Sequence, residues 1–475
     1  MPHAPATPRT RARALAAAVG LAVLAALAGC GSERASLPRP RGILLVVLDT
    51  LRADGLSLYG NPRQTSPALD ALAARSVVFE NAVSHAPWTL PSFVGLLSGR
   101  YPSSSVFSEG TLHTSLVEAL RTAGYRTAAF TEGGYVSRHF GLDRGFESFW
   151  EEEGKTFLAR PGTPRGAGSV ERTFDAAIAW LHEPRSEPFF LLVHTYEIHT
   201  PYRQREYAEE LPRGRLGPTY EERDRQAVRS GRLSVGPVER AYVRALYDGG
   251  VRAVDRQVER LLRAVEETGR ADDTLVVVTS DHGEDLGGRS PRALGDHGHQ
   301  LYDELLRVPL VVRLPGAPWP AGRVDTQVRL VDVVPTLLEL AGAPVPAGLA
   351  GSSLVPVLEG RERSPRLAYA ELRRSPWNEH PRTAVRDGRY KLIANLLPRA
   401  PGWPEIEFYD VGADPGEQEN LIGIRSAALD GLARSLETQR RALHGDGTLA
   451  MPEEGLAPPE LRRQLEALGY VDAHP

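Results

Sequence analysis

Side chains that bind metal ions follow three separate apolar runs of this sequence. Asp49 comes directly after ILLVVL, His194 follows FFLLV with His199 shortly after it, and Asp281 and His282 come directly after LVVVTS. Continuous apolar runs are typical of strands buried on both faces of a parallel sheet, and ligands of such sheets bind at the carboxyl ends of the strands. We therefore expect these side chains to meet at one edge of a sheet, where two carboxylates and an imidazole could hold a divalent cation.

A hydroxyl group stands where it could attack an ester. In NAVSHAPWTLPSFVGLLSGRYP, residues 81–102, Thr89 precedes an apolar run that predicts a short helix, with Pro91 in its first turn and Gly99 at its end. The free amides at a helix N-terminus favour an anion, so Thr89 is a candidate nucleophile for a phosphate or sulfate ester. Taken alone, the stretch is better explained by a threonine that caps a buried helix. Because the chain also has metal-ligand residues at several strand ends, we favour the nucleophile over the helix cap.

The elements that must position these side chains alternate along the chain. After the strand expected at 43–48, further strands are expected at 127–130, 189–193, 274–280 and 308–314, and helices near 114–123, 171–182, 238–268 and in DVVPTLLELAG. Such alternation predicts an α/β fold with a large, mostly parallel β-sheet flanked by helices. Residues 151–170 and 203–237 have weak periodicity and are interpreted as surface insertions that shape access to the site.

The C-terminal part of the sequence has a different pattern. LAYAEL, PRTAVRDGRYKLIANL and IEFYDV predict strands joined by turns, which form a small antiparallel subdomain, and a charged helix is expected near 424–444. We therefore divide the mature chain into a tether at 30–41, a catalytic domain at 42–362, a C-terminal subdomain at 363–446 and a tail at 447–475 with a short helix.

The N-terminal segment predicts export and lipidation. Three arginines precede the apolar run ALAAAVGLAVLAALAG, which ends in LAGC, a sequence that resembles a bacterial lipobox. We expect residues 1–29 to be a lipoprotein signal peptide and Cys30, the only cysteine, to anchor the protein in the bacterial cell envelope, at the outer membrane or facing the periplasm. A plain secretory signal is the alternative. The formal net charge of -4 gives no reason to expect a nucleic-acid partner.

Several long segments resemble the sulfatase family within the alkaline phosphatase superfamily. VVLDTLRADGLSLYGN and APWTLPSFVGLLSGRYP near the start, PFFLLVHTYEIHTPY in the middle, and TLVVVTSDHGEDLG and HGHQLYDELLRVPLVVRLPG later occur in the order found in that family. The resemblance extends from about residue 42 to about residue 422. It implies the fold expected above and a metal-dependent ester hydrolase.

The resemblance also implies roles for the residues introduced above. Asp49, Thr89, Asp281 and His282 would hold one divalent metal ion, and the histidine suits zinc or manganese better than calcium. Thr89 would be the nucleophile, and His199 would assist the leaving group.

Four further residues are expected to bind substrate. The resemblance places a cationic group that holds substrate oxygens near the HGH sequence, and spacing does not decide which histidine supplies it. Glu284 and Asp285 could orient His282, or could simply be loop charges. The substrate-binding candidates are His194, His297, His299 and Arg52.

The chain departs from the sulfatase pattern at the nucleophile. Sulfatases have a Cys or Ser, converted to formylglycine, within Cys/Ser-x-Pro-x-Arg, whereas this chain has Thr89, which cannot be converted, and Phe93 in place of the arginine. The family's Lys-x-His pair is absent from TEGGYVSRHFG. A threonine nucleophile is found in similar phosphodiesterase-like members of the superfamily and in its phosphoethanolamine and lipoteichoic acid transferases.

We therefore predict a hydrolase of sulfate or phosphate esters that acts through a covalent intermediate on Thr89. It would need one divalent metal ion (Ca, Zn or Mn), no formylglycine, and a small-molecule or glycan ester as substrate. Two alternatives remain open at this point. One is a transferase that passes a phospho-substituent to an envelope glycan or lipid, and the other is a non-catalytic relative that binds an anionic glycan.

Overall fold

The computed structural model describes residues 37, 39–103, 115–152, 169–289, 292–317, 319–373, 380–395, 406–424 and 426–444. The predicted signal peptide, Cys30 and the tail at 447–475 lie outside the described residues. Within the described residues, no helix is both long enough and apolar enough to cross a membrane.

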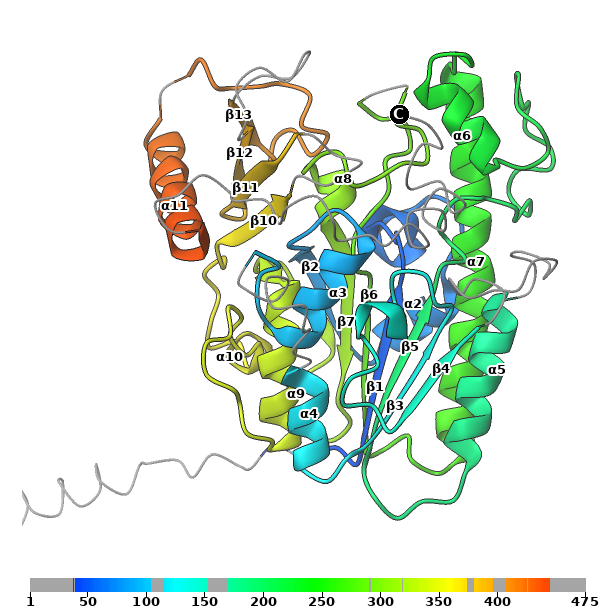
Figure 1. The fold of residues 1–475 in the computed structure, drawn as a ribbon, viewed down its shortest axis with the longest axis vertical. Helices are drawn as coiled ribbons and strands as arrows, with labels where there is room; N and C mark the ends of the chain where they lie inside the picture. The colour runs from blue at the N-terminus through cyan, green and yellow to red at the C-terminus, as the bar shows by residue number, and fades with distance from the viewer. Residues whose placement is uncertain are drawn as a thin grey trace, which may run out of the picture. The chain divides into compact units, whose positions relative to one another are not determined.

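A nine-stranded sheet forms the centre of the fold (Figure 1). Its strand order is β4-β3-β5-β1-β6-β7-β2-β8, and β9 pairs with β2. The five strands from β4 to β6 in this order are parallel, whereas β7 runs antiparallel to both β6 and β2. The strands are β1 (Gly42–Leu48), β2 (Val77–Val83), β3 (Arg126–Thr131), β4 (Ser148–Glu151), β5 (Phe189–Thr195), β6 (Thr274–Thr279), β7 (Arg307–Arg313), β8 (Gly322–Val324) and β9 (Val328–Arg329).

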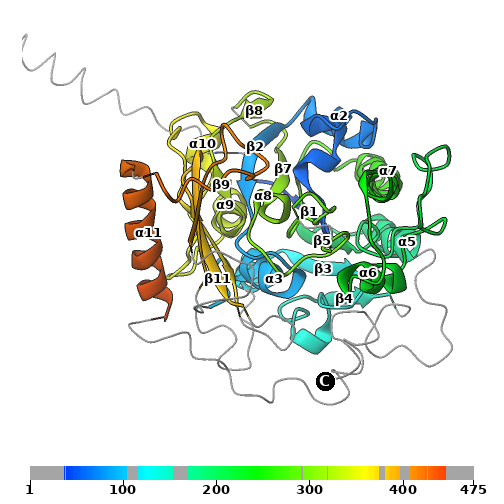
Figure 2. The same ribbon diagram turned by 90° about the horizontal axis from the view of Figure 1, so that it is seen from above.

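Helices cover both faces of this sheet, as Figures 1 and 2 show. One face carries α2 (Pro67–Ala73), α5 (Ser169–His182) and α7 (Pro237–Glu267), of which α7 contacts the other two. The other face carries α3 (Thr89–Ser98), α4 (Ser115–Thr122) and α9 (Val333–Ala341). Short 3-10 turns lie at 53–55, 57–59, 138–140 and 330–332, and the short helices are α6 (Glu222–Arg229), α8 (Asp303–Leu306) and α10 (Val355–Leu358).

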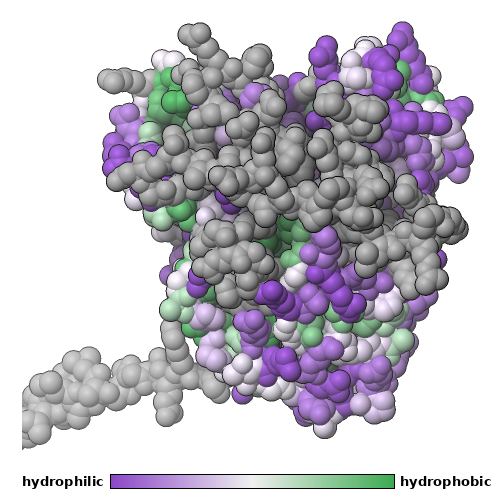
Figure 3. All heavy atoms as spheres, viewed as in Figure 1, coloured by the Kyte–Doolittle hydropathy of each residue, from purple (hydrophilic) through white to green (hydrophobic). Residues whose placement is uncertain are grey.

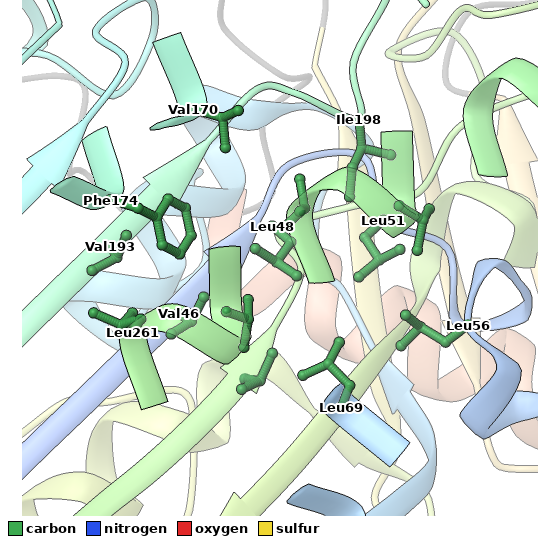
Figure 4. Close-up of a cluster of buried hydrophobic side chains, with 14 of the residues drawn as sticks. Val46, Leu48, Leu51, Leu56, Leu69, Val170, Phe174, Val193, Ile198 and Leu261 are labelled. Atoms are coloured by element: carbon green, nitrogen blue, oxygen red, sulfur yellow. The ribbon is translucent and has the colours of Figure 1, made fainter. Parts of the chain in front are cut away.

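The apolar strand runs form the core of these layers. Every residue of β1 and β5 is buried, because each strand has a helical layer on both faces. Figure 4 shows part of the core on the α5 and α7 side, where Val46 and Leu48 of β1 lie near Phe174 of α5 and Leu261 of α7. Burial of this apolar surface stabilises the sheet by roughly 25 cal/mol per Å².

The register of the central strands brings the expected site residues to one edge. In the parallel pairing of β1 with β5, Val47 is opposite His194, and in the pairing of β1 with β6 it is opposite Thr279. The three strands therefore end at the same level, with β1 in the middle. Asp49 follows β1 and Asp281 follows β6, so both carboxylates lie at the edge predicted from the sequence.

The C-terminal part forms a second sheet. Its four strands are antiparallel in the order β10 (Ala368–Leu372), β11 (Arg382–Arg386), β12 (Tyr390–Asn395) and β13 (Ile406–Asp410). Helix α11 (Ala427–His444) packs on β11 and β12. The predicted fold class, an α/β fold with a large, mostly parallel sheet and a small C-terminal antiparallel subdomain, is confirmed.

Two parts of the fold differ from the sequence-based expectations. Strand β2 was not predicted, because Glu80 and Asn81 interrupt its apolar pattern and it pairs antiparallel with β7. The region 203–237, interpreted from its weak periodicity as a surface insertion, contains α6, in which Arg225 and Val228 are buried. The residues of α6 are mostly charged or polar, and the buried Arg225 is held by ion pairs with Glu222 and Asp296. Most of the other insertion, 151–170, lies outside the described residues.

The described surface is mixed in polarity. On the face drawn in Figure 3, hydrophilic and hydrophobic residues are interspersed. Among the described residues, the exposed large hydrophobic side chains are scattered singly, at Val238, Val345, Ile406, Ile422 and Ile424.

Candidate active site and metal centre

Helix α3 presents Thr89 at its first turn, as the sequence predicted. Trp88 is extended before the helix (φ -158°, ψ 163°), and Gly99 ends the helix in the left-handed conformation (φ 69°). All ten residues of α3 are buried. The ring of His85 packs against the helix at Gly95, where a Cβ atom would lie only 2.0 Å from Nε2 of His85. Only glycine fits this close approach, which fixes the helix against the preceding loop.

The hydroxyl of Thr89 lies between a carboxylate and an imidazole. Its Oγ1 donates a hydrogen bond of 3.1 Å to Oδ2 of Asp49 and is 3.3 Å from Nε2 of His282. Thr89 is only 1% exposed. Helix α3 therefore holds the hydroxyl against the ends of β1 and β6, next to the candidate metal ligands.

Asp49, Asp281 and His282 form a group suited to a divalent metal ion. Their ligand atoms all lie within 4.8 Å of one another, and no other such group of histidine, cysteine and acidic residues occurs in the part of the chain that the structure describes. Oδ1 of Asp49 and Oδ2 of Asp281 are buried, and neither has a hydrogen-bond partner among the described residues. Burial and the nearby Asp281 raise the pKa of Asp49 well above its usual value. A cation that bound both orphaned oxygens would offset this repulsion, so these residues fit a metal ion.

Thr50, which directly follows Asp49, makes contacts that fix the neighbouring carboxylates. Its φ of 58° is unusual for a β-branched residue. Its hydroxyl donates to the carbonyl of Asp49, and its amide is 3.4 Å from Oδ1 of Asp281. A second hydrogen bond of 2.9 Å reaches the same Oδ1 from the amide of His282. These amides hold one oxygen of Asp281 and leave the other, Oδ2, free for a ligand.

His194 lies behind Asp49, away from solvent. Its Nε2 is 3.3 Å from Oδ2 of Asp49, and its ring is completely buried. The ring meets Phe93 edge-on, at a centroid distance of 4.9 Å, and Tyr196 in the same way. This position suits a residue that orients a metal-binding carboxylate, and differs from the substrate-binding role expected from the sequence.

The rings of three histidines lie in a row, which begins at the candidate metal ligand His282 and continues through His297 to His199. The ring of His297 lies 4.7 Å from that of His282 and 4.9 Å from that of His199, measured between centroids. His299 instead faces Asp285, with Nε2 3.4 Å from Oδ2. Of the two alternatives that spacing left open, the geometry favours His297 as the group near the reacting atoms.

The protonation of this row follows from burial. Burial, followed by the neighbouring His297, lowers the pKa of His199 to about 3, so its imidazole is neutral at neutral pH. Burial and His282 likewise lower the pKa of His297 well below its usual value. Burial alone would also lower the pKa of His299, but Asp285 and Asp296 outweigh it and raise the pKa above its usual value.

Two further expectations concern Arg52 and Glu284. The guanidinium of Arg52 is held by Asp54, at 2.7 Å, and by the carbonyl of Glu284, and its role in substrate binding stays a prediction. Glu284 does not orient His282, whose Nδ1 is 2.8 Å from the carbonyl of Gly283. It binds Nδ1 of His297 instead, at 2.9 Å.

Comparison with known protein families shows which family the chain belongs to. A family model described as Sulfatase matches residues 41–343, and one described as N-sulphoglucosamine sulphohydrolase, C-terminal matches residues 295–443. The chain belongs to the sulfatase family. Family membership confirms the prediction of an ester hydrolase of this family and gives the second sheet its counterpart in known sulfatases.

Relatives of this sulfatase-family chain cover most of its length. A Delta 4,5-hexuronate-2-O-sulfatase of Bacteroides thetaiotaomicron is 29% identical over 83% of this chain and 87% of its own. A solved structure in complex with its substrate D-glucosamine-2-N,6-O-disulfate has a TM-score of 0.70 at 22% identity and covers 88% of this chain and 100% of the other. The phosphonate monoester hydrolase of Agrobacterium radiobacter has a TM-score of 0.65 at 23% identity, with coverage of 85% and 96%. The two structural matches establish the shared fold.

Some residues of this sulfatase-family site were missed from the sequence. Tyr202 donates a hydrogen bond of 2.7 Å to Glu284, on the carboxylate that holds His297. Burial raises the pKa of Glu284 to about 7. Tyr202 is the last residue of the HTPY sequence, which begins with His199. Its closeness to His199 in the sequence was the only signal that could have identified it.

Proposed function

We propose that this sulfatase-family chain is a metal-dependent hydrolase of sulfate or phosphate esters in which Thr89 is the nucleophile. The observation that supports this most is the position of the Thr89 hydroxyl, 3.1 Å from Asp49 and 3.3 Å from His282 at the N-terminus of α3. The same two residues, with Asp281, would hold the metal ion. A bound divalent cation would lower the pKa of the hydroxyl and stabilise negative charge on the ester oxygens.

The reaction would proceed in two displacements. Oγ1 of Thr89 attacks the central sulfur or phosphorus in line, a new Oγ1 ester bond forms, and the bond to the leaving oxygen breaks. The proton of the Thr89 hydroxyl is lost to solvent, and His199, neutral in the free protein, relays a proton from solvent to the leaving oxygen. Water then attacks the central atom of the threonine ester, its hydroxyl goes to that atom, and a proton returns to Oγ1. His297 contacts the ester oxygens, with its ring oriented by Glu284.

The residues at the nucleophile favour phosphoryl transfer within this class. In the sulfate ester of a formylglycine hydrate, the free second hydroxyl can become the aldehyde oxygen while sulfate is expelled. A threonine ester has no second hydroxyl, so it must be cleaved by attack at the central atom. Phe93 removes the cationic side chain of the sulfatase motif. The names of similar proteins span both chemistries, from a hexuronate sulfatase to a phosphonate monoester hydrolase. They also support a glycan ester as the substrate.

The N-terminal sequence supports a location for this activity. We propose that Cys30 is lipidated after removal of residues 1–29 and tethers the enzyme in the bacterial cell envelope through residues 30–41. Globomycin treatment, which blocks lipoprotein signal cleavage, would retain the precursor, and Cys30→Ser would incorporate no labelled fatty acid. Incorporation of labelled fatty acid by Cys30→Ser at the level of the wild type would contradict the anchor.

Substrate panels test the proposed function. Aryl sulfate, aryl phosphate, aryl phosphonate and aryl phosphodiester would be offered to the wild type, to Thr89→Ala and to Thr89→Ser, after chelation and with Zn, Mn or Ca added back. The proposal predicts metal-dependent turnover that is lost in Thr89→Ala and retained in part by Thr89→Ser. Turnover that persists after exhaustive chelation, or in Thr89→Ala, would contradict it.

A further inference from the structure

The insertion at 203–237 is attached to the loop that carries His297. Tyr202 and Tyr220 pair through two backbone hydrogen bonds, of 2.9 and 3.0 Å, so residues 203–219 of the insertion leave and rejoin the fold at the same point. The two tyrosine rings stack, with centroids 5.9 Å apart. Helix α6 begins directly after Tyr220, with a capping box between Glu221 and Asp224.

Three consecutive residues of the loop, 294–296, each accept a hydrogen bond from the segment 200–225. The hydroxyl of Tyr220 donates to the carbonyl of Leu294 at 2.7 Å, and the hydroxyl of Thr200 donates to the carbonyl of Gly295 at 3.0 Å. The guanidinium of Arg225 donates to Oδ1 of Asp296 at 2.8 Å. Gly295 has a φ of 69°, and a Cβ there would lie 2.9 Å from the ring of Tyr220. Each residue of the loop from 294 to 296 is therefore held by a hydrogen bond from the segment 200–225.

The charge-assisted hydrogen bond from Arg225 to Asp296 is the strongest of these contacts, and Asp296 in turn binds the backbone of His297. The side chain of Arg225 is only 10% exposed, and its guanidinium lies between Asp296 and Glu222, each at 2.8 Å. Oδ1 of Asp296 also accepts a hydrogen bond of 3.0 Å from the amide of His297. One carboxylate oxygen thus joins the insertion to the backbone of the histidine that stands beside His282. Charge-assisted hydrogen bonds of this kind restrict geometry more strongly than neutral ones.

We infer that Arg225 is a positioning residue: through Asp296 it fixes the backbone of His297 and so holds the His297 imidazole between His282 and His199. The inference rests on the proposed function, because it assigns His297 to the reacting ester. It gives the insertion a catalytic purpose beyond covering the site. A side chain misplaced by about 1 Å can cost about 100-fold in rate, so a single ion pair at this distance from the chemistry can matter.

Variants of α6 provide a matched test. Arg225→Met removes the charge and keeps the stem, Arg225→Lys restores a charge, and Arg223→Met changes an arginine on the same helix whose side chain is 81% exposed. Asp296→Asn weakens the pair from the other side. We expect Arg225→Met and Asp296→Asn to lower kcat by about 100-fold with KM within about threefold, Arg225→Lys to recover part of the loss, and Arg223→Met to match the wild type.

A second readout separates this inference from the proposed function. Imidazole resonances of histidine-labelled full-length protein, assigned with a His297→Gln variant, report the surroundings of His297 without any substrate. We expect the His297 signal to move in Arg225→Met and Asp296→Asn and to stay in Arg223→Met. If the wild type turns over no ester but the signal moves, the proposed function fails and the positioning holds. If the signal and kcat of folded Arg225→Met both equal those of the wild type, the inference is wrong.

Discussion

The ring of Phe93 meets the imidazole of His194 edge-on, with centroids 4.9 Å apart and planes at 87°. Phe93 is completely buried. It occupies the motif position at which sulfatases have arginine, and His194 reaches past it to Asp49 at 3.3 Å. The aromatic pair therefore supports the candidate metal-binding carboxylate, and any side chain at position 93 is buried away from water.

Restoring the motif arginine should not restore the site. Phe93→Arg would bury a guanidinium with no partner, which we expect to lower the free energy of unfolding by at least about 3 kcal/mol. Phe93→Leu, which stays apolar, should cost less. Chemical denaturation of both variants measures the difference. A stable Phe93→Arg protein with wild-type unfolding behaviour would show that the pocket accepts the charge, contrary to this expectation.

Removal of a ligand carboxylate should uncouple metal binding from stability. Wild-type protein at a metal concentration of 100 times Kd should gain about 2.7 kcal/mol over chelated protein. Asp49→Asn should lose this gain, and its chelated form should melt no lower than the chelated wild type because the repulsion with Asp281 is gone. Differential scanning calorimetry with and without chelator checks both. A metal-induced shift of full size in Asp49→Asn would place the ion elsewhere.

Acid should weaken the seat of α3 through His85. Burial lowers the pKa of His85 to about 4 from its usual 6.5, although the contacts of Nε2 with the carbonyls of Pro91 and Ser92 act in the opposite direction. The folded state binds this proton less tightly than the unfolded state, so the stabilisation is complete above pH 6.5 and is lost as the pH falls through about 4. The loss amounts to about 3 kcal/mol.

Unfolding free energies measured across that pH range test the role of His85. His85→Gln, whose amide can donate to the same carbonyls, should flatten the pH dependence. The same substitution at His182, whose side chain is 45% exposed, should leave it as in the wild type. If His85→Gln and the wild type lose stability in parallel, the acid sensitivity has another source.

Breaking a buried ion network should loosen the C-terminal sheet. Nζ of Lys391 lies 2.9 Å from Asp303 and 3.0 Å from Glu417, and all three side chains are less than 10% exposed. Lys391→Met removes the cation that the two carboxylates share and, among the described residues, leaves Asp303 with only its pair to Arg386, and we expect a loss of about 3–5 kcal/mol. Arg389→Met, which removes a cation that is 65% exposed and pairs with Asp410, should cost about 1 kcal/mol or less. Equal losses in the two variants would contradict the network's role.

The sequence predicted the parts of the site that depend on strand ends and on a helix start. Asp49, Asp281 and His282 could be placed together because parallel strands end at one edge, and Thr89 because Pro91 and Gly99 delimit a helix. These features are local, and they are encoded in runs of neighbouring residues. The alternation of strands and helices was sufficient for the fold class for the same reason.

The remaining features depend on contacts between distant segments. Nothing near Arg225 in the sequence indicates that it meets Asp296, because the pair joins an insertion to a loop 71 residues away. The partner of Glu284 could not be predicted either, because its partner His297 is 13 residues away along the chain, whereas His282 is much nearer in the sequence. The ion pair of Arg52 with Asp54, two residues on, was not predicted.

The central claim is that Thr89 becomes covalently modified during turnover. The most direct measurement is peptide mass spectrometry of wild-type enzyme quenched in acid within the first turnover of its best aryl ester. Thr89→Ser and Thr89→Ala would be treated in parallel. The account predicts a mass increase of one sulfuryl or phosphoryl group on Thr89, the same increase on the serine of Thr89→Ser, and none in Thr89→Ala. Turnover by the wild type with an unmodified Thr89, matched by turnover of Thr89→Ala at a similar rate, would contradict it.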